Sequence, residues 1–144
     1  MTRKSAIVTA IAGTLLAAIP AWAHHAFAAE FDAKRPLHFE GKVTKVELIN
    51  PHAWIHVEVK AADGTSADWM VEAGSPNVLL RRGFTKQTVA IGTQVVIDGY
   101  QSKDGSNRMN GRDITLPGGQ KLFLGSGNTG APGETAPPAG PGRH

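Results

Sequence analysis

The sequence has 144 residues, a formal net charge of +3 and no cysteine, and its length is typical of a single domain. The lack of cysteine excludes disulfide bonds, thiolate metal ligands, cysteine nucleophiles and c-type haem attachment. Acidic and basic residues are interspersed rather than gathered into a basic stripe, which argues against nucleic acid as a partner.

The first 23 residues have the pattern of a secretory signal peptide. Arg3 and Lys4 form a basic start, residues 6–19 form an apolar run, and a small-residue motif ends at Ala23. The run is shorter than the roughly 20 residues that cross a bilayer. We therefore expect cleavage after Ala23, no stable membrane span afterwards, and a periplasmic or secreted location. Loss of the two basic residues leaves 13 Lys and Arg against 12 Asp and Glu, so the mature chain is nearly neutral.

The rest of the chain divides into three predicted parts. Residues 24–36 form a lead-in, residues 37–124 form the folded domain, and residues 125–144 form a tail. The tail is rich in Gly, Pro and Ala and poor in large apolar side chains. Such a segment buries too little apolar surface to offset the entropy of ordering, so we expect it to be disordered.

Within the domain, alternation and turn residues predict five to six strands, the last of them a short edge strand. The segment 53–60 alternates between apolar and polar side chains, which is typical of a half-buried strand. Gly41 is expected to mark a bulge or a close approach of another strand, and Asp63-Gly64 is a hairpin turn signal. The expected strands cover residues 39–48, 53–60, 67–73, 94–100, 109–116 and 121–124.

A short helix is predicted between the third and fourth strands. Ser75 is expected as its N-cap, Pro76 fits the first helical position, residues 77–82 follow, and Gly83 is a suitable C-terminal stop. This order of elements indicates a mainly β fold, specifically a small OB-like barrel of five to six strands with the helix between strands 3 and 4. A small open sandwich would give a similar order and is the alternative.

Five segments together resemble one family. They are HHAFAAEFD, INPHAWIHVEV, WMVEAGSPNVLLRRGF, VVIDGYQSKDGS and ITLPGGQKLF. The sequence resembles an uncharacterised family of small secreted proteobacterial proteins, known only as a domain of unknown function, over nearly all of residues 24–124. The resemblance implies an exported single domain and supplies no catalytic residues to carry over.

Cleavage of the signal peptide would make His24 the first residue, followed by His25. The α-amine of an N-terminal histidine, with a pKa of about 7.7–8.0, and its ring nitrogen can chelate a metal ion together. A further imidazole would complete a nitrogen-rich tetragonal set, which favours Cu(II). His52 and His56 are the candidate third ligands, and His38 is less suited. On one strand His52 and His56 would lie about 13 Å apart, so a site would use one of them.

This arrangement resembles the histidine brace of copper-binding periplasmic proteins and of the copper polysaccharide monooxygenases, and it implies copper as a cofactor. Only the N-terminal histidine matches those families. The alternative is a solvated chain start that binds no metal, because chain termini are usually mobile.

A second candidate site is the outer face of the strand at residues 53–60. Trp54, His56 and Glu58 lie opposite its apolar face and could bind another exported protein. Alternatively, the helix or the N-terminal segment covers this face. The sequence offers no catalytic constellation, so an enzyme, specifically a copper oxygenase, is the least favoured hypothesis. The leading hypothesis is an exported small binding protein that captures Cu(II), and the alternative is an accessory protein without metal.

Overall fold

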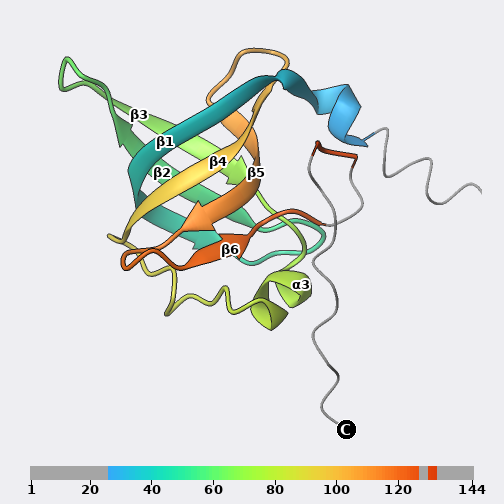
Figure 1. The fold of residues 1–144 in the computed structure, drawn as a ribbon, viewed down its shortest axis with the longest axis vertical. Coiled ribbons are helices and arrows are strands. Elements are labelled where there is room, and N and C mark those ends of the chain that lie inside the picture. Colours follow the sequence, from blue (N-terminus) through green and yellow to red (C-terminus); the bar gives the residue numbers. More distant parts are fainter. Residues whose placement is uncertain (1–25, 127–129, 133–144) are drawn as a thin grey trace, which may run out of the picture.

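The computed structural model describes residues 26–126 and 130–132 of the chain, and Figure 1 shows their arrangement. A helical turn at residues 26–30 leads directly into the first strand. No helix in these described ranges is long and apolar enough to cross a membrane. The labelled elements are β1 (Phe31–Glu47), β2 (Trp54–Lys60), β3 (Ser66–Glu72), α3 (Pro76–Arg81), β4 (Gln94–Ser102), β5 (Arg108–Thr115) and β6 (Lys121–Phe123).

Five of the six strands close into a ring (Figure 1). The hydrogen-bonded order is β3-β2-β1-β4-β5-β6, and β3 also pairs with β5. Neighbouring strands pair antiparallel except at this β3–β5 seam, where Met70–Glu72 runs parallel to Arg108–Asn110. All strands belong to one sheet, unlike the two stacked sheets of a sandwich. The prediction of a mainly β fold with a short helix between the third and fourth strands is confirmed.

Strand β1 begins at Phe31, well before the predicted start at residue 39. It pairs with β4 from Phe31 opposite Ser102 to Lys42 opposite Gln94, with an irregularity between Phe31 and Pro36. Residues 33–36 are all exposed, so the alternation that marks a half-buried strand is missing from this part of the sequence. The predicted start was therefore wrong, and part of the expected lead-in, residues 31–36, belongs to β1.

The hydrophobic core fills the interior of the ring. In β2 and just before it, Ala53, Ile55 and Val57 are completely buried, while the intervening side chains are only partly buried, so the predicted alternation is confirmed. The segment between β3 and β4 adds Leu79, Phe84 and Val89 to the same core, and Leu124 adds to it after β6. Its largest fully buried side chains are Phe84, Ile55, Leu79, Ile97, Met109, Ile114 and Leu124.

Gly41 allows β1 and β2 to approach closely. A Cβ atom at this position would lie 2.4 Å from Val57 Cγ1 and 2.7 Å from the Glu58 carbonyl oxygen. No side chain fits at such distances, so the predicted close approach is confirmed. The register shift of β1 against β2 lies further along the strand, between Val43 and Lys45.

Helix α3 lies at one end of the ring (Figure 1). Ser75 is the N-cap residue and its carbonyl oxygen accepts the Leu79 N–H at 3.1 Å, but its side chain forms no capping hydrogen bond. Pro76 begins the helix as predicted. Gly83 has a φ of 89°, which confirms the predicted stop. Leu79 and Phe84 are completely buried, so this short helix is held mainly by packing.

A second, smaller apolar cluster joins the two ends of the described chain. Phe27 packs edge-on against Tyr100 at 5.6 Å between ring centroids and lies 5.8 Å from Phe31. Ala131 completes the cluster, and the Tyr100 hydroxyl donates to the Pro132 carbonyl oxygen at 3.2 Å. Ala131 and Pro132, which belong to the predicted tail, therefore contact the folded domain. Residues 133–144 lie outside the described part.

Asp104, in the turn between β4 and β5, should make the stability of the fold sensitive to acid. Hydrogen bonds from the Ser102 hydroxyl and from the Ser106 side chain and N–H lower the pKa of Asp104 from 3.8 to about 2. A carboxyl group with a lowered folded pKa stabilises the fold above its unfolded pKa, and this stabilisation is lost as the pH falls through the folded value. We expect Asp104→Asn to flatten the pH dependence of the free energy of unfolding between about pH 4 and pH 2. Denaturant unfolding at a series of fixed pH values measures the free energy of unfolding of both proteins. The same change of this free energy with pH in the variant and in the native protein would contradict the prediction.

Candidate functional site

The structure separates the residues that the sequence singled out. His24 and His25 lie outside the described residues. His52 and Trp54 line one cavity together, whereas Glu58 lines a different groove. The predicted candidates therefore do not form a single site among the described residues.

A cavity of about 330 Å³ lies beside the β3–β5 seam, and we call it the seam cavity. Three parts of the chain meet there: the N-terminal helical turn with the start of β1, the start of β2, and the paired ends of β3 and β5. Both aromatic and charged side chains line it. The lining residues are Ala26, Phe27, Glu30, Phe31, His52, Trp54, Glu72, Arg108 and Asn110.

His52 and Glu72 form the polar centre of the seam cavity. His52 precedes β2, and its Nδ1 lies 3.5 Å from Glu72 Oε1 and 3.4 Å from the Ala73 carbonyl oxygen. The Glu72 side chain is 15 % exposed and that of His52 is 40 % exposed. Burial raises the pKa of Glu72, and the nearby charge of His52 offsets part of this effect. The cavity thus presents an accessible imidazole backed by a largely buried carboxyl group.

Arg108 and Glu30 tie the N-terminal helical turn to β5. Arg108 Nη2 donates to Glu30 Oε2 at 3.0 Å, and its guanidinium lies over the Phe31 ring at 5.5 Å from the centroid. Arg108 Nε is buried and has no hydrogen-bond partner among the described residues. Lys103, just after β4, also holds this turn: its N–H donates to the Glu30 carbonyl oxygen at 2.9 Å. One wall of the seam cavity is therefore fixed to the ring.

The remaining candidates on β2 are engaged elsewhere. His56 Nε2 lies 2.7 Å from Glu47 Oε2, and Glu58 Oε1 lies 3.3 Å from Lys42 Nζ. Their side chains are partly buried on the outer face of β2. Trp54, by contrast, lies beside the N-terminal helical turn, so this turn flanks one end of the predicted partner-binding face. His38 was the less suited candidate, and its Nδ1 lies 2.6 Å from Asp98 Oδ1.

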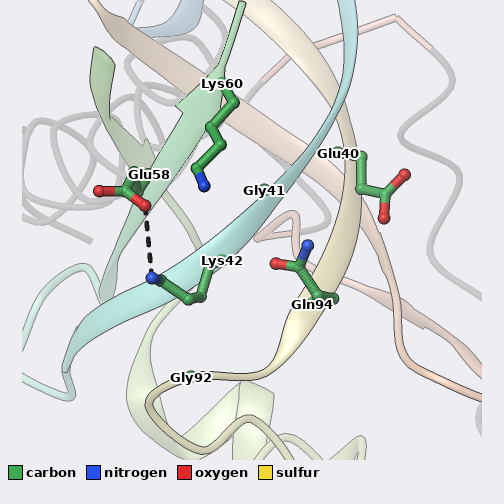
Figure 2. A pocket seen from close by; sticks show the side chains of 7 residues that line it. All are labelled: Glu40, Gly41, Lys42, Glu58, Lys60, Gly92 and Gln94. Carbon is green, nitrogen blue, oxygen red and sulfur yellow. Dashed lines mark ion pairs between the residues drawn. The ribbon is translucent and has the colours of Figure 1, made fainter. Parts of the chain in front are cut away.

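A second groove crosses the outer face of β1 near β2 and β4 (Figure 2). It has about the same volume as the seam cavity, about 330 Å³. Figure 2 shows the Lys42–Glu58 ion pair on one side and the Glu40 carboxylate pointing away from it. Lys60 and Gln94 add one cation and one neutral amide. The charges of this groove nearly balance, and it holds no histidine, so it is a weaker candidate for metal binding.

The sequence could have indicated Glu72 but not Arg108. An Asp63-Gly64 turn fixes the β2–β3 register, which places Glu72 opposite Trp54. Arg108 reaches the cavity only because β5 pairs with β3, and no local pattern signals that pairing. Among residues 26–126 and 130–132, no group of three or more His, Cys, Asp or Glu side chains could hold a metal ion.

Comparison with known proteins gives one match. No curated protein matches the chain, and no solved structure does. A family model matches residues 13–111, from the apolar N-terminal run to the middle of β5. The chain therefore belongs to the family of unknown function DUF6152.

Proposed function

We propose that the protein is exported, begins at His24 after cleavage, and binds Cu(II) through the α-amine and imidazole of His24 with His52 as a further nitrogen ligand. The observation that carries the proposal is the position of Ala26. This residue lines the seam cavity together with His52. His25, next to His24 in the sequence, would assist capture.

The short stretch of chain between His24 and Ala26 supports this arrangement. Ala26 is the second residue after His24, and two residues of chain span at most about 7 Å. The turn that carries Ala26 is anchored, since Phe27 is only 5 % exposed and Glu30 is bound to Arg108. An anchored turn lowers the entropy that is lost when the chain start is fixed on a metal.

His52 suits the third position better than His56. His52 is 40 % exposed and lines the seam cavity, whereas His56 does not line it and its Nε2 is bound to Glu47. A set of one amine and two imidazoles is rich in nitrogen, which favours Cu(II) over the other common divalent ions. Such a protein would carry or buffer copper for an exported partner.

An accessory protein without metal is the second candidate. Met70 is 38 % exposed and lies opposite His56 on the neighbouring strand. Together with Trp54 these residues give the outer face of β2 and β3 some apolar surface, which is typical of a protein-binding face. A mature chain that does not bind copper would favour this role.

Copper titration of the mature chain tests the proposal. We expect one tight Cu(II) site in protein that begins at His24. Acetylation of the His24 α-amine removes one of the two chelating donors, so it should weaken binding by about 100-fold or more, beyond the roughly 10- to 100-fold cost of losing a hydrogen-bonded neighbour of a ligand. Isothermal titration against a competing chelator measures both affinities.

Two histidine variants complete this test. His52→Ala should also weaken binding, whereas His38→Ala, which alters a histidine outside the seam cavity, should leave the affinity unchanged. Equal affinities for the native and the N-acetylated chain would overturn the proposal.

A further inference from the structure

We propose that the seam cavity binds a small organic ammonium ion, with Glu72 as its anionic partner, Asn110 as a second polar contact and Trp54 as part of its aromatic wall. The cavity volume of about 330 Å³ lies in the range of small-molecule sites. The proposal uses described residues alone and does not rest on copper binding.

Trp54, Glu72 and Asn110 form a row across three neighbouring strands. Trp54 of β2 is opposite Glu72 of β3, and Glu72 is opposite Asn110 of β5. All three line the seam cavity. The row lies on the outer face of the ring, because successive side chains of a strand point to opposite faces and the neighbouring Ile55 and Val71 are completely buried in the interior.

The N-terminal helical turn covers this row. Phe27 of the turn packs edge-on against Tyr100 at 5.6 Å between ring centroids, and Tyr100 is opposite Asn110 on β4. Phe27 and Phe31 both line the cavity and are 5 % and 3 % exposed. The cavity therefore lies between the outer face of the sheet and an apolar turn, where it can enclose an organic molecule.

The charges of the lining leave one carboxylate for a ligand. Arg108 Nη2 donates to Glu30 Oε2 at 3.0 Å, so these two groups neutralise each other. Among the described residues, the one ion pair of Glu72 is the longer contact with His52 at 3.5 Å. Burial raises the pKa of Glu72, the charge of His52 lowers it, and the charge of Glu30 raises it again. A positive ligand would relieve this repulsion between the two carboxylates.

Asn110 supplies an amide that is free to bond a ligand. The residue is only 9 % exposed, and its side chain forms no hydrogen bond with another described residue. Buried amides nearly always have a hydrogen-bond partner. An ammonium group has several N–H donors, so the amide oxygen of Asn110 can accept one while the Glu72 carboxylate accepts another.

The aromatic side chains of the lining also favour a cation. Positive groups are attracted to the faces of aromatic rings, most strongly to that of tryptophan. One such contact already exists in this lining, since the Arg108 guanidinium lies 5.5 Å from the centroid of the Phe31 ring. Trp54 lies next to Glu72 in the row. An ammonium ion on an apolar stem fits a carboxylate beside aromatic rings better than an anion or a purely apolar molecule does.

Three probes of similar shape test the chemistry of the ligand. 2-Phenylethylammonium carries an ammonium group on an aromatic stem, 2-phenylethanol carries a neutral hydroxyl group, and 3-phenylpropionate carries a carboxylate. In NMR titrations of the native chain with a chelator present, the ammonium probe should shift the amide signals of Glu72 and Asn110. The alcohol should bind about 10-fold or more weakly, because it lacks the hydrogen bond between charged groups. Equal affinities for the ammonium ion and the alcohol, tighter binding of the carboxylate, or no binding of the ammonium ion at millimolar concentration would each overturn the proposal.

Glu72→Gln tests which residue is the anionic partner. This variant should bind 2-phenylethylammonium about 10-fold or more weakly and 2-phenylethanol with native affinity. Glu58→Gln is the matched control, because it removes a carboxylate from the outer face of β2 outside the seam cavity, and it should bind both probes as the native chain does. Native affinity of Glu72→Gln for the ammonium probe, or an equal loss in Glu58→Gln, would overturn the proposal.

The comparison of probes decides the question even if Glu72→Gln fails to fold, because it uses the native chain. The chelator keeps these titrations separate from the copper titration. Loss of copper binding on acetylation of His24 therefore neither supports nor contradicts the ammonium site, and each proposal can fail alone.

Discussion

Leu79→Ala is expected to lower the free energy of unfolding by about 2–5 kcal/mol, the range for truncating a buried leucine. Leu79 is completely buried in the core, on the short helix α3 that lies at one end of the ring. A helix of 6 residues is too short to be stable by itself, so it depends on this contact. Since domains of this size are stable by only about 5–15 kcal/mol, the variant should unfold at a much lower denaturant concentration.

The neighbouring leucine provides a matched control in the same helix. Leu80 is 46 % exposed, so Leu80→Ala removes the same atoms from a position largely in water and should cost about 1 kcal/mol or less. Urea unfolding followed by tryptophan fluorescence measures both variants. Similar losses for the two variants would contradict the packing of α3 described above.

Gly99→Ala is expected to be the second strongly destabilising change. A Cβ atom there would lie 2.2 Å from the Asn110 carbonyl oxygen and 2.5 Å from Met109 Cε. The oxygen belongs to the backbone of the paired strand β5, so no side-chain rotation relieves the overlap. We expect a loss at or above the upper end of the roughly 1–3 kcal/mol that overpacking costs.

Gly105→Ala distinguishes this overlap from an ordinary effect of replacing glycine. Gly105 has a φ of 75° and nothing within 4 Å of a Cβ atom, so alanine there is strained only through its backbone, at about 1–2 kcal/mol. Thermal and urea unfolding should therefore rank Gly99→Ala as the less stable variant. The reverse order would show that β4 and β5 are not packed as described.

Features with local causes could be predicted from the sequence. The alternation at residues 53–60 identified the buried side of β2, and Gly83 marked the end of α3 through its positive φ. The start of β1 could not be found in this way, because residues 33–36 are all exposed. Those residues are in a strand because β4 lies alongside, which is a tertiary cause.

The candidate site likewise combines features that the sequence predicts with features that depend on tertiary contacts. His52 and Trp54 were identified from residue type and position, and the structure places them in one cavity. The choice between His52 and His56 needed the position of Ala26 and the contact of His56 with Glu47. Both depend on contacts between segments that are distant in the sequence. The spacing of residues along a strand cannot predict such contacts.

The small aromatic cluster makes the two ends of the described chain depend on each other. Phe27 belongs to the helical turn that leads into β1, and Ala131 comes from the Gly- and Pro-rich segment near the other end. A protease that trimmed the chain before Ala131 would expose Phe27 and Tyr100 to water and loosen the turn that carries Ala26. Cutting the chain near one end of its described part would in this way change the structure near the other end.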